Sequence, residues 1–324
     1  MSIKTIVIAL AAAAASASAM AQHVGSEYRL KTVIPVVGRQ GIAIDSNYYY
    51  VSDTRALYKY DKQGNLLQKN DAPFRHPEIA NHFGDIDVFD GEIYCGIERF
   101  EYGRGYNIAV SVYDAGTLEW KRDFTWAPES GQVEVSGIAV DRDKRMVWMS
   151  DWVDSRYAYC YDLDTGRYRT KMQCVPTPYW CQGIFIADGK ILFSADDGEA
   201  AYNLPDNIYV ADIGEVPFTG LVEGEEVVKD TPFSVKIGED GKPVTRKGLV
   251  AGGAQRGDVS LLRSMTDFRR AGEIEGLAID PVNDDLVVLN NRGTTIVLGM
   301  SQGPITEEGY TGEVHELYVY EKVK

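Results

Sequence analysis

Gln40-Gly41-Ile42-Ala43-Ile44-Asp45 is the first of five copies of one phrase, in which a glycine precedes an alternating apolar strand. The other copies are Phe83-Gly84-Asp85-Ile86-Asp87-Val88, Ser136-Gly137-Ile138-Ala139-Val140-Asp141, Gln182-Gly183-Ile184-Phe185-Ile186 and Glu275-Gly276-Leu277-Ala278-Ile279-Asp280. Such a repeat indicates a propeller or a solenoid, because one unit cannot bury its own apolar face and must stack on its neighbours.

Each phrase is followed by turn-forming residues and then by further strands. The expected second strands cover residues 48–51, 92–95, 146–149, 191–193 and 286–289, and the third strands end at Asp61, Asp114, Asp162, Asp212 and Glu321. Turns rich in Asp, Asn and Gly join these strands, and a fourth, outer strand follows. We therefore predict an all-β fold, a β-propeller of four-stranded antiparallel blades.

The number of blades depends on one long interval. Gly183 and Gly276 are separated by about twice the usual repeat, which leaves room for a sixth unit. Residues 213–257 contain no glycine phrase, however, and instead suggest a hairpin around residues 233–249 that turns at Glu239-Asp240-Gly241-Lys242. We favour five blades with an inserted hairpin, and six blades remain the alternative.

The two ends of the chain are expected to share one blade. The last unit reaches the C-terminus at its third strand, and residues 28–36 form a strand just before the first glycine phrase. We predict that residues 28–36 pair with the strand around residues 317–320. This closure would remove open sheet edges, which otherwise promote aggregation.

Residues 1–21 have the pattern of a cleaved signal peptide. Lys4 precedes an apolar stretch, and Ala19-Met20-Ala21 supplies small residues before Gln22. A membrane anchor is the alternative, but the apolar stretch is shorter than the roughly 20 residues that span a bilayer. We expect a periplasmic or secreted protein with one propeller domain over residues 22–324 and no transmembrane segment after cleavage.

The charge of the chain limits the class of partner. With 48 acidic and 33 basic residues, the net charge is −15 at pH 7. Such a surface repels nucleic acid, whose non-specific binding depends on Lys and Arg contacts to phosphates. We expect a monomer that binds a small molecule, a glycan or a peptide; simple solubility is the other explanation of the acidity.

The four cysteines allow two interpretations. Cys95, Cys160, Cys174 and Cys181 would meet an oxidising compartment if the chain is exported. They could form two disulfides, with Cys174 and Cys181 the first pair to test, or they could be buried free thiols.

Polar residues recur at matching positions of the units. In a propeller the first strand of each blade lines the central channel, and the loops at one end of it open on one face. Second strands end near Asp53, Glu98, Asp151, Asp196 and Asn290, and Gln40, His82, Asp85, Glu134, Ser136, Gln182 and Glu275 lie near the starts of first strands. This recurrence predicts a ligand site on the channel face.

We predict three kinds of site residue there. Glu98, Asp151, Asp196, Glu275 and Asn290 would hold a divalent cation, namely calcium, because oxygen ligands suit a hard ion. Gln40, Gln182, Trp152 and Trp180 would bind the ligand, the Trp rings by stacking. His82 and Asp85 would move protons in catalysis. Acids that only cap turns, and a structural histidine, are the alternatives.

The glycine phrases, the Glu275-Gly276 step and the Asn290-Asn291 pair resemble the superfamily of SMP-30, gluconolactonase and strictosidine-synthase-like propellers. In that superfamily a Glu on a first strand and Asn or Asp residues on inner loops hold a divalent cation. The resemblance implies this role for Glu275, Asn290, Asp151 and Asp196. It also implies six blades, and the other four phrases lack the Glu before the glycine.

Two functions follow from these predictions. The first is a propeller that binds a ligand at an acidic, calcium-binding channel face without catalysis. The alternative is a metal-dependent lactonase or esterase, in which the metal polarises the carbonyl group and His82 or Asp85 transfers a proton. A phosphate loop and a zinc-binding spacing are absent from the sequence.

Overall fold

The computed structural model describes residues 28–323 except 102–103, 153, 199–203, 215, 232–233, 269–271, 293, 298–299 and 305–312. The predicted signal peptide, residues 1–21, and the predicted mature N-terminus at Gln22 lie outside these residues. Among the helices of the described part, none is long and apolar enough to span a membrane.

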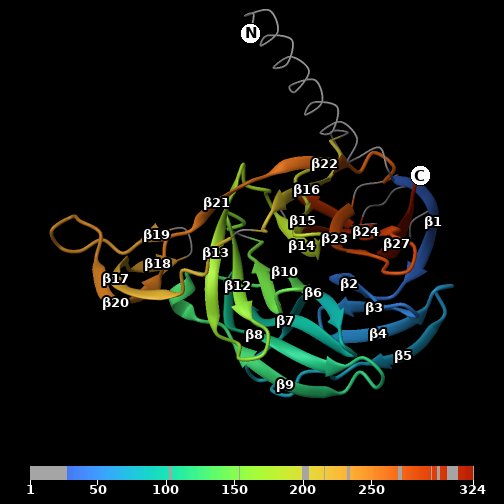
Figure 1. The fold of residues 1–324 in the computed structure, drawn as a ribbon, viewed down its shortest axis with the longest axis horizontal. Helices are drawn as coiled ribbons and strands as arrows, with labels where there is room; N and C mark the ends of the chain where they lie inside the picture. Colours follow the sequence, from blue (N-terminus) through green and yellow to red (C-terminus); the bar gives the residue numbers. More distant parts are fainter. Residues whose placement is uncertain are drawn as a thin grey trace, which may run out of the picture.

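Five sheets, each with four antiparallel strands, form a ring, and the third sheet carries a fifth, parallel strand (Figure 1). From the axis outward, blade 1 consists of β2 (Gly41–Ile44), β3 (Tyr48–Asp53), β4 (Ala56–Asp61) and β5 (Leu66–Asn70). Blade 2 consists of β6 (His82–Phe89), β7 (Glu92–Glu101), β8 (Arg104–Asp114) and β9 (Trp120–Thr125). Blade 3 consists of β10 (Gly137–Asp141), β11 (Met146–Ser150), β12 (Tyr157–Asp162) and β13 (Tyr168–Val175). Blades 4 and 5 consist of β14 (Cys181–Ala187), β15 (Lys190–Ala195), β16 (Asn207–Asp212) and β22 (Ser260–Ser264); and β23 (Gly272–Ile279), β24 (Leu286–Arg292), β27 (Val314–Lys322) and β1 (Tyr28–Val36). The prediction of five blades is confirmed.

Tight turns join the first two strands of each blade. Asp90-Gly91 and Asp188-Gly189 adopt positive φ angles of 52°, 73°, 51° and 70° respectively. Two consecutive residues with positive φ make the turn whose twist matches that of the flanking antiparallel strands, and Asp-Gly favours it. The sequence therefore fixes the β6–β7 and β14–β15 hairpins locally.

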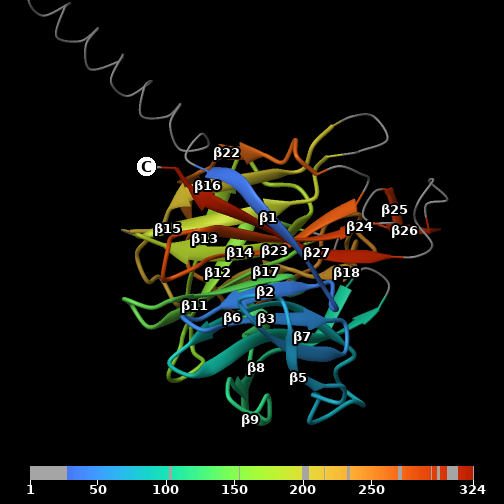
Figure 2. The same ribbon diagram turned by 90° about the vertical axis from the view of Figure 1, so that its right-hand side faces the viewer.

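The two ends of the chain close the ring in blade 5. β1 pairs antiparallel with β27, with Leu30 opposite Tyr320 and Ile34 opposite Leu317. β1 thereby covers the outer edge of β27 (Figure 2), as predicted.

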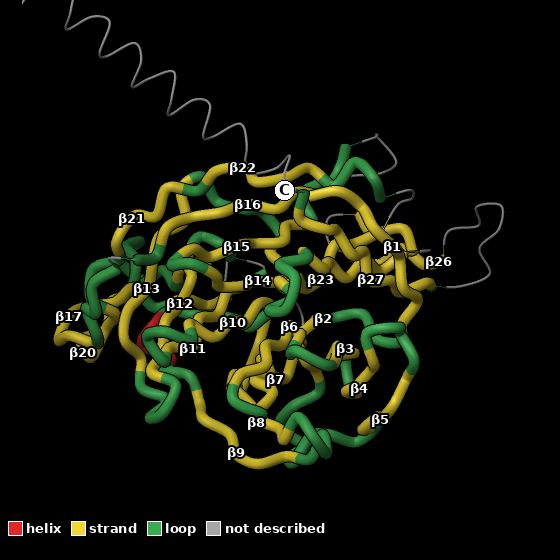
Figure 3. Tube along the Cα trace, turned by 45° about the vertical axis from the view of Figure 1, so that its right-hand side comes forward, coloured by secondary structure: helices red, strands yellow, loops and turns green. Residues whose placement is uncertain are grey.

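The long interval between Gly183 and Gly276 contains an insertion within blade 4. β17 (Leu221–Val227) pairs with β20 (Thr245–Ala251), and β18 (Lys229–Thr231) pairs with β19 (Ser234–Val235). The turn lies where the sequence predicts it, closed by the Gly238 N–H that donates to the Lys242 carbonyl. β20 begins within the predicted range of residues 233–249, but its partner β17 lies before that range. This hairpin extends beside blade 3 (Figure 3).

The chain then returns to complete blade 4. β21 (Gln255–Asp258) adds a parallel strand to β13, and β22 supplies the fourth strand. The remaining elements are the 3₁₀ turn η1 (Pro128–Ser130) and the hairpin of β25 (Thr294–Val297) with β26 (Met300–Pro304).

Apolar side chains fill the spaces between adjacent blades. Tyr50 and Leu57 of blade 1 pack in one cluster with Phe83 and Ile86 of blade 2, and all four are at most 1 % exposed. The cysteines belong to these clusters: all four are buried free thiols. The interpretation as small hydrophobic residues is confirmed over the disulfide interpretation.

The repeated glycines meet at the axis because the inner strands come into contact there. A Cβ atom on Gly183 would lie 2.6 Å from the Gly276 Cα, and one on Gly276 would lie 2.8 Å from the Gly41 Cα. The same hypothetical Cβ atoms would also meet the carboxyl group of Asp85. A residue with a side chain therefore does not fit at these positions.

Asp85 joins three of the inner strands. Its Oδ1 accepts the backbone N–H groups of Ile86, at 2.9 Å, and Ile42, at 3.3 Å, and its Oδ2 accepts that of Ile184, at 3.2 Å. Burial raises the pKa of Asp85, and the three N–H donors oppose that rise. This carboxyl group occupies the space that the missing side chains leave.

Hydrogen bonds around the axis link every pair of neighbouring blades. In order round the ring they are Ser52 Oγ to the Gly84 carbonyl, the Asp85 N–H to the Ser136 carbonyl, Ser136 Oγ to the Cys181 carbonyl, Ser194 Oγ to the Glu275 carbonyl, and the Gly276 N–H to the Gln40 carbonyl. The ring of bonds holds the starts of the inner strands in fixed positions.

We expect Gly183→Ala and Gly276→Ala to destabilise the protein strongly. Each added methyl group would meet backbone atoms of a neighbouring blade, which cannot move independently, so the cost should be roughly 2–3 kcal/mol of unfolding free energy. Gly248→Ala in β20 is the matched control, because its Cβ would meet nothing within 4 Å. Urea unfolding measures all three; a cost at Gly183 and Gly276 no larger than at Gly248 would contradict the close packing.

Candidate functional site

One end of the axis opens into a cavity to which every blade contributes. The cavity has a volume of about 190 Å³. Each blade contributes one lining residue that lies one or two positions before its repeated glycine. These residues are Gln40, His82, Ser136, Gln182 and Glu275. Arg39, Phe100, Glu134, Trp152 and Glu273 complete its walls.

The cavity is open to ligands. The side chains of Arg39 and His82 are 26 % and 20 % exposed, so solvent reaches the cavity, whereas Glu273 and Glu275 are almost fully buried in it. Both of these carboxyl groups come from β23 and line the cavity. The cavity therefore combines a polar rim with buried carboxyl groups.

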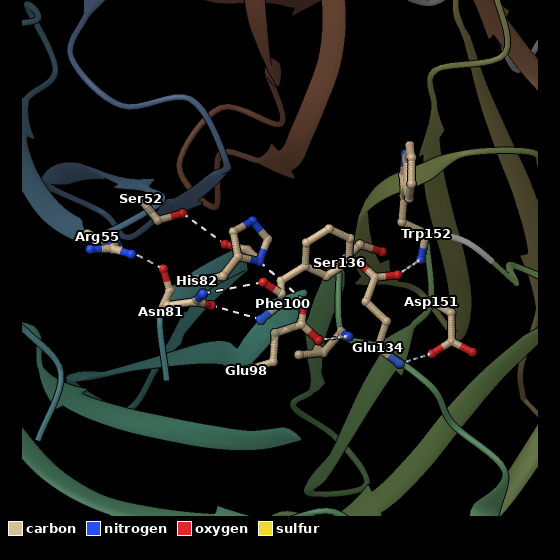
Figure 4. Close-up of polar contacts among 12 residues, drawn as sticks. Ser52, Arg55, Asn81, His82, Glu98, Phe100, Glu134, Ser136, Asp151 and Trp152 are labelled. Atoms are coloured by element: carbon tan, nitrogen blue, oxygen red, sulfur yellow. Dashed lines mark hydrogen bonds and ion pairs between the residues drawn. The ribbon is translucent and has the colours of Figure 1, made fainter. Parts of the chain in front are cut away.

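His82 is paired with a buried carboxyl group. His82 Nδ1 lies 3.3 Å from Glu98 Oε1, and the two residues face each other across β6 and β7. Glu98 Oε2 accepts the backbone N–H of Val135 from blade 3 at 2.9 Å. Figure 4 shows His82 beside Phe100, with Glu98 below them in the view.

Burial favours the neutral forms of both groups in this pair. Desolvation lowers the pKa of His82 to about 4 and raises that of Glu98 to about 8. The contact between His82 Nδ1 and Glu98 Oε1 holds the imidazole ring in one orientation.

The carboxyl groups of β23 form the acidic wall of the cavity. Glu273 Oε1 accepts a hydrogen bond from the side-chain amide of Gln182. Burial raises the pKa of Glu273 to about 7, and burial together with the charge of Glu273 raises the pKa of Glu275 well above its usual range. Arg39 opposes both shifts, and its guanidinium group contacts Glu313 at 3.2 Å.

The residues predicted to bind calcium lie in separate environments. Asp151 accepts the N–H groups of Val133 and Glu134 and the Tyr159 hydroxyl. Asp196 interacts with Asp206, and Glu98 with His82. Only Glu275 of the predicted ligands lines the cavity.

These side chains do not fit one shared calcium site. In the described ranges, no group of three or more His, Cys, Asp or Glu side chains is arranged to hold a metal ion. The buried amide of Asn290 has no hydrogen-bond partner among the described residues, but Asn290 does not line the cavity. Calcium binding remains a prediction.

The predicted catalytic residues are also separated. His82 lines the cavity, whereas Asp85 lies on the axis and is 1 % exposed. Three backbone N–H groups donate to the Asp85 carboxyl group, which also contacts the glycines, so Asp85 is a structural residue.

An aromatic pair separates the cavity from a second one. The rings of Trp152 and Trp180 have centroids 4.7 Å apart. The second cavity, also about 190 Å³, is lined by Trp152, Asp154, Ser155, Arg156, Thr177, Tyr179 and Trp180. Trp180 has a φ of +54°, a conformation unusual for a bulky residue and often found at ligand sites.

Sequence reasoning missed Arg39, Phe100 and Glu273 as cavity residues. Arg39 and Glu273 each lie within two residues of a predicted site residue, Gln40 and Glu275, and this closeness in sequence is the signal that could have indicated them. Phe100 has no such signal, because the register of β7 near its end is irregular.

We predict that His82 stays neutral from pH 5.5 to pH 8. NMR of ¹⁵N-labelled imidazole should show no protonation of His82 in this range, because burial lowers its pKa to about 4. Glu98→Gln should leave the pKa low, since an amide can replace the neutral carboxyl group. If the pKa of His82 were near 6.5 or above and fell in Glu98→Gln, an ion pair between His82 and Glu98 would be shown instead.

Many solved structures are similar to this chain, and two of them are described here. The crystal structure of Myxococcus xanthus glutaminyl cyclase aligns with a TM-score of 0.49 and 8 % identity, over 92 % of this chain and 97 % of that one. A structure of U3-55K aligns with a TM-score of 0.40 and 10 % identity, over 86 % of this chain and 67 % of that one. No family model and no curated protein matches the chain. Independently of these matches, the sheet topology of the described residues gives five blades, so the six blades that the SMP-30-like resemblance implies are not present in the described ring.

Proposed function

We propose that the protein binds a small polar ligand, or the end of a glycan or peptide, in the cavity at the end of the propeller axis. The observation that carries this proposal is the contribution of one polar side chain by each blade, Gln40, His82, Ser136, Gln182 and Glu275, to one cavity. Ligand sites in proteins combine a preformed hollow with a few polar groups that converge on it. The bonded axis holds these groups in place before a ligand arrives.

The aromatic residues support an elongated ligand. Trp152 lines both cavities, and Tyr179 is 66 % exposed beside Trp180. A sugar ring or a planar group could stack on this surface while the polar end of the same ligand enters the central cavity. Export of the protein, supported by the sequence of residues 1–21, would bring the cavity into contact with extracellular or periplasmic solutes.

The pairing of His82 with Glu98 supports hydrolysis of a lactone or ester as a second candidate function. A histidine held by a carboxyl group and facing a cavity is placed to transfer a proton. Glu98 would act as a positioning residue, since it contacts His82 and Val135 and does not line the cavity.

The binding proposal predicts that Gln40→Ala weakens ligand affinity at least about tenfold, which corresponds to one lost hydrogen bond of roughly 1.4 kcal/mol. Tryptophan fluorescence and thermal shift would follow a panel of monosaccharides, oligosaccharides and short peptides, with calcium or chelator added to parallel samples. Gln173→Ala, an exposed glutamine of β13, is the matched control. The proposal fails if no compound binds, or if each binder affects both variants equally.

The hydrolase candidate makes a separate prediction with lactones and esters. His82→Gln should abolish turnover, whereas His76→Gln should retain it, because the His76 side chain is 53 % exposed and outside the cavity. Initial rates on purified variants measure the effect. Equal rates in the two variants, or no turnover by the unmodified protein, would remove hydrolysis as a candidate.

A further inference from the structure

The lining of the central cavity favours a cation. Three glutamates, Glu134, Glu273 and Glu275, line the cavity together with a single permanent cation, Arg39, and His82 is neutral at neutral pH. The whole chain carries a net charge of −15, so its long-range field also attracts cations. An anionic ligand would meet repulsion from both sources.

A buried acceptor in this cavity has no partner within the protein. Glu275 is 2 % exposed, and its Oε1 atom has no hydrogen-bond partner among the described residues. Buried polar atoms are normally paired, so an acceptor at a cavity wall without a protein partner is open to a hydrogen bond from a ligand. Glu273 lines the same cavity from β23, and the Gln182 amide donates to its carboxyl group.

Aromatic rings form another part of the wall. Phe100 and Trp152 line the cavity, and the Phe100 ring lies 5.5 Å from the His82 ring. The face of an aromatic ring attracts cations, most strongly where water is excluded. Carboxyl groups and aromatic rings together favour an organic cation, whereas a metal ion would need several oxygen ligands at one point.

Resting on the proposed binding function, we propose that the ligand carries a primary ammonium group that enters this cavity. Its three N–H donors would bond to Glu275, Glu273 and the side-chain carbonyl of Gln40, and its hydrocarbon part would contact Phe100 and Trp152. The cation stabilises the ionised form of the two buried carboxyl groups, which is unfavourable in its absence. A quaternary ammonium, which has no N–H group, would leave the acceptors unpaired.

Benzylammonium is the probe, with benzyl alcohol and benzoate as neutral and anionic compounds of similar size. Only benzylammonium should raise the melting temperature and change the tryptophan emission in a saturable manner. Glu275→Gln, which keeps the shape and removes the charge, should lower its affinity at least tenfold. Glu223→Gln, on the hairpin outside the cavity, should leave the affinity unchanged.

Each outcome decides the inference. Equal binding of benzyl alcohol, preference for benzoate, or an unchanged affinity in Glu275→Gln overturns it. If circular dichroism shows that Glu275→Gln does not fold, Glu273→Gln takes its place with the same expectation. Binding of a neutral sugar that is sensitive to Gln40→Ala, without any effect of benzylammonium, overturns the ammonium inference and leaves the proposed binding function intact.

Discussion

Close contact of the inner strands at the axis is the constraint on which the rest of the structure depends. Gly41, Gly183 and Gly276 approach one another so closely that only a hydrogen atom fits on each Cα, and the carboxyl group of Asp85 fills the space between them. Five blades leave little room at the centre. The glycine phrase is therefore a requirement of the geometry, and the short apolar strand after it packs against the neighbouring blade.

This packing determines where a ligand can bind. Asp85 and the glycines fill the axis at their own level. The residues one or two positions before the glycines therefore direct their side chains to the end of the axis rather than into it. Gln40, Gln182 and Glu275 each precede such a glycine, and all three line the cavity. The hydrogen bonds between blades fix the backbone at these residues, so their side chains surround the cavity without rearrangement.

The fold could be predicted from the sequence because its signals are local and repeated. The glycine phrases predicted the blades, and the Asp-Gly turns predicted hairpins within them. The strand at residues 28–36 was predicted to pair with the last unit, because that unit lacked a fourth strand. The site was predicted in part: the positions before the glycines were correctly placed at the cavity. Glu98, Asp151 and Asp196 did not join them, although each ends a second strand or lies near its end.

For Glu98 and Asp196 the reason lies in the irregular pairing at the glycines of their blades, whereas the first two strands of blade 3, which carries Asp151, pair regularly. The register shifts between Phe83 and Ile86, between Cys181 and Gly183, and between Ile274 and Leu277. Each such bulge changes which face of the sheet the next side chain occupies, so the direction of a carboxyl group cannot be counted from a regular alternation. Backbone N–H groups in neighbouring loops then bind Glu98 and Asp151.

The most direct test of the account is a crystal structure of the protein grown with saturating benzylammonium. The account predicts electron density for the ligand in the central cavity, with its nitrogen within hydrogen-bond distance of Glu275 and its ring near Phe100 or Trp152, and with Asp85 unmoved on the axis. A well-ordered ligand bound elsewhere, with the central cavity filled by the protein's own side chains, would contradict it.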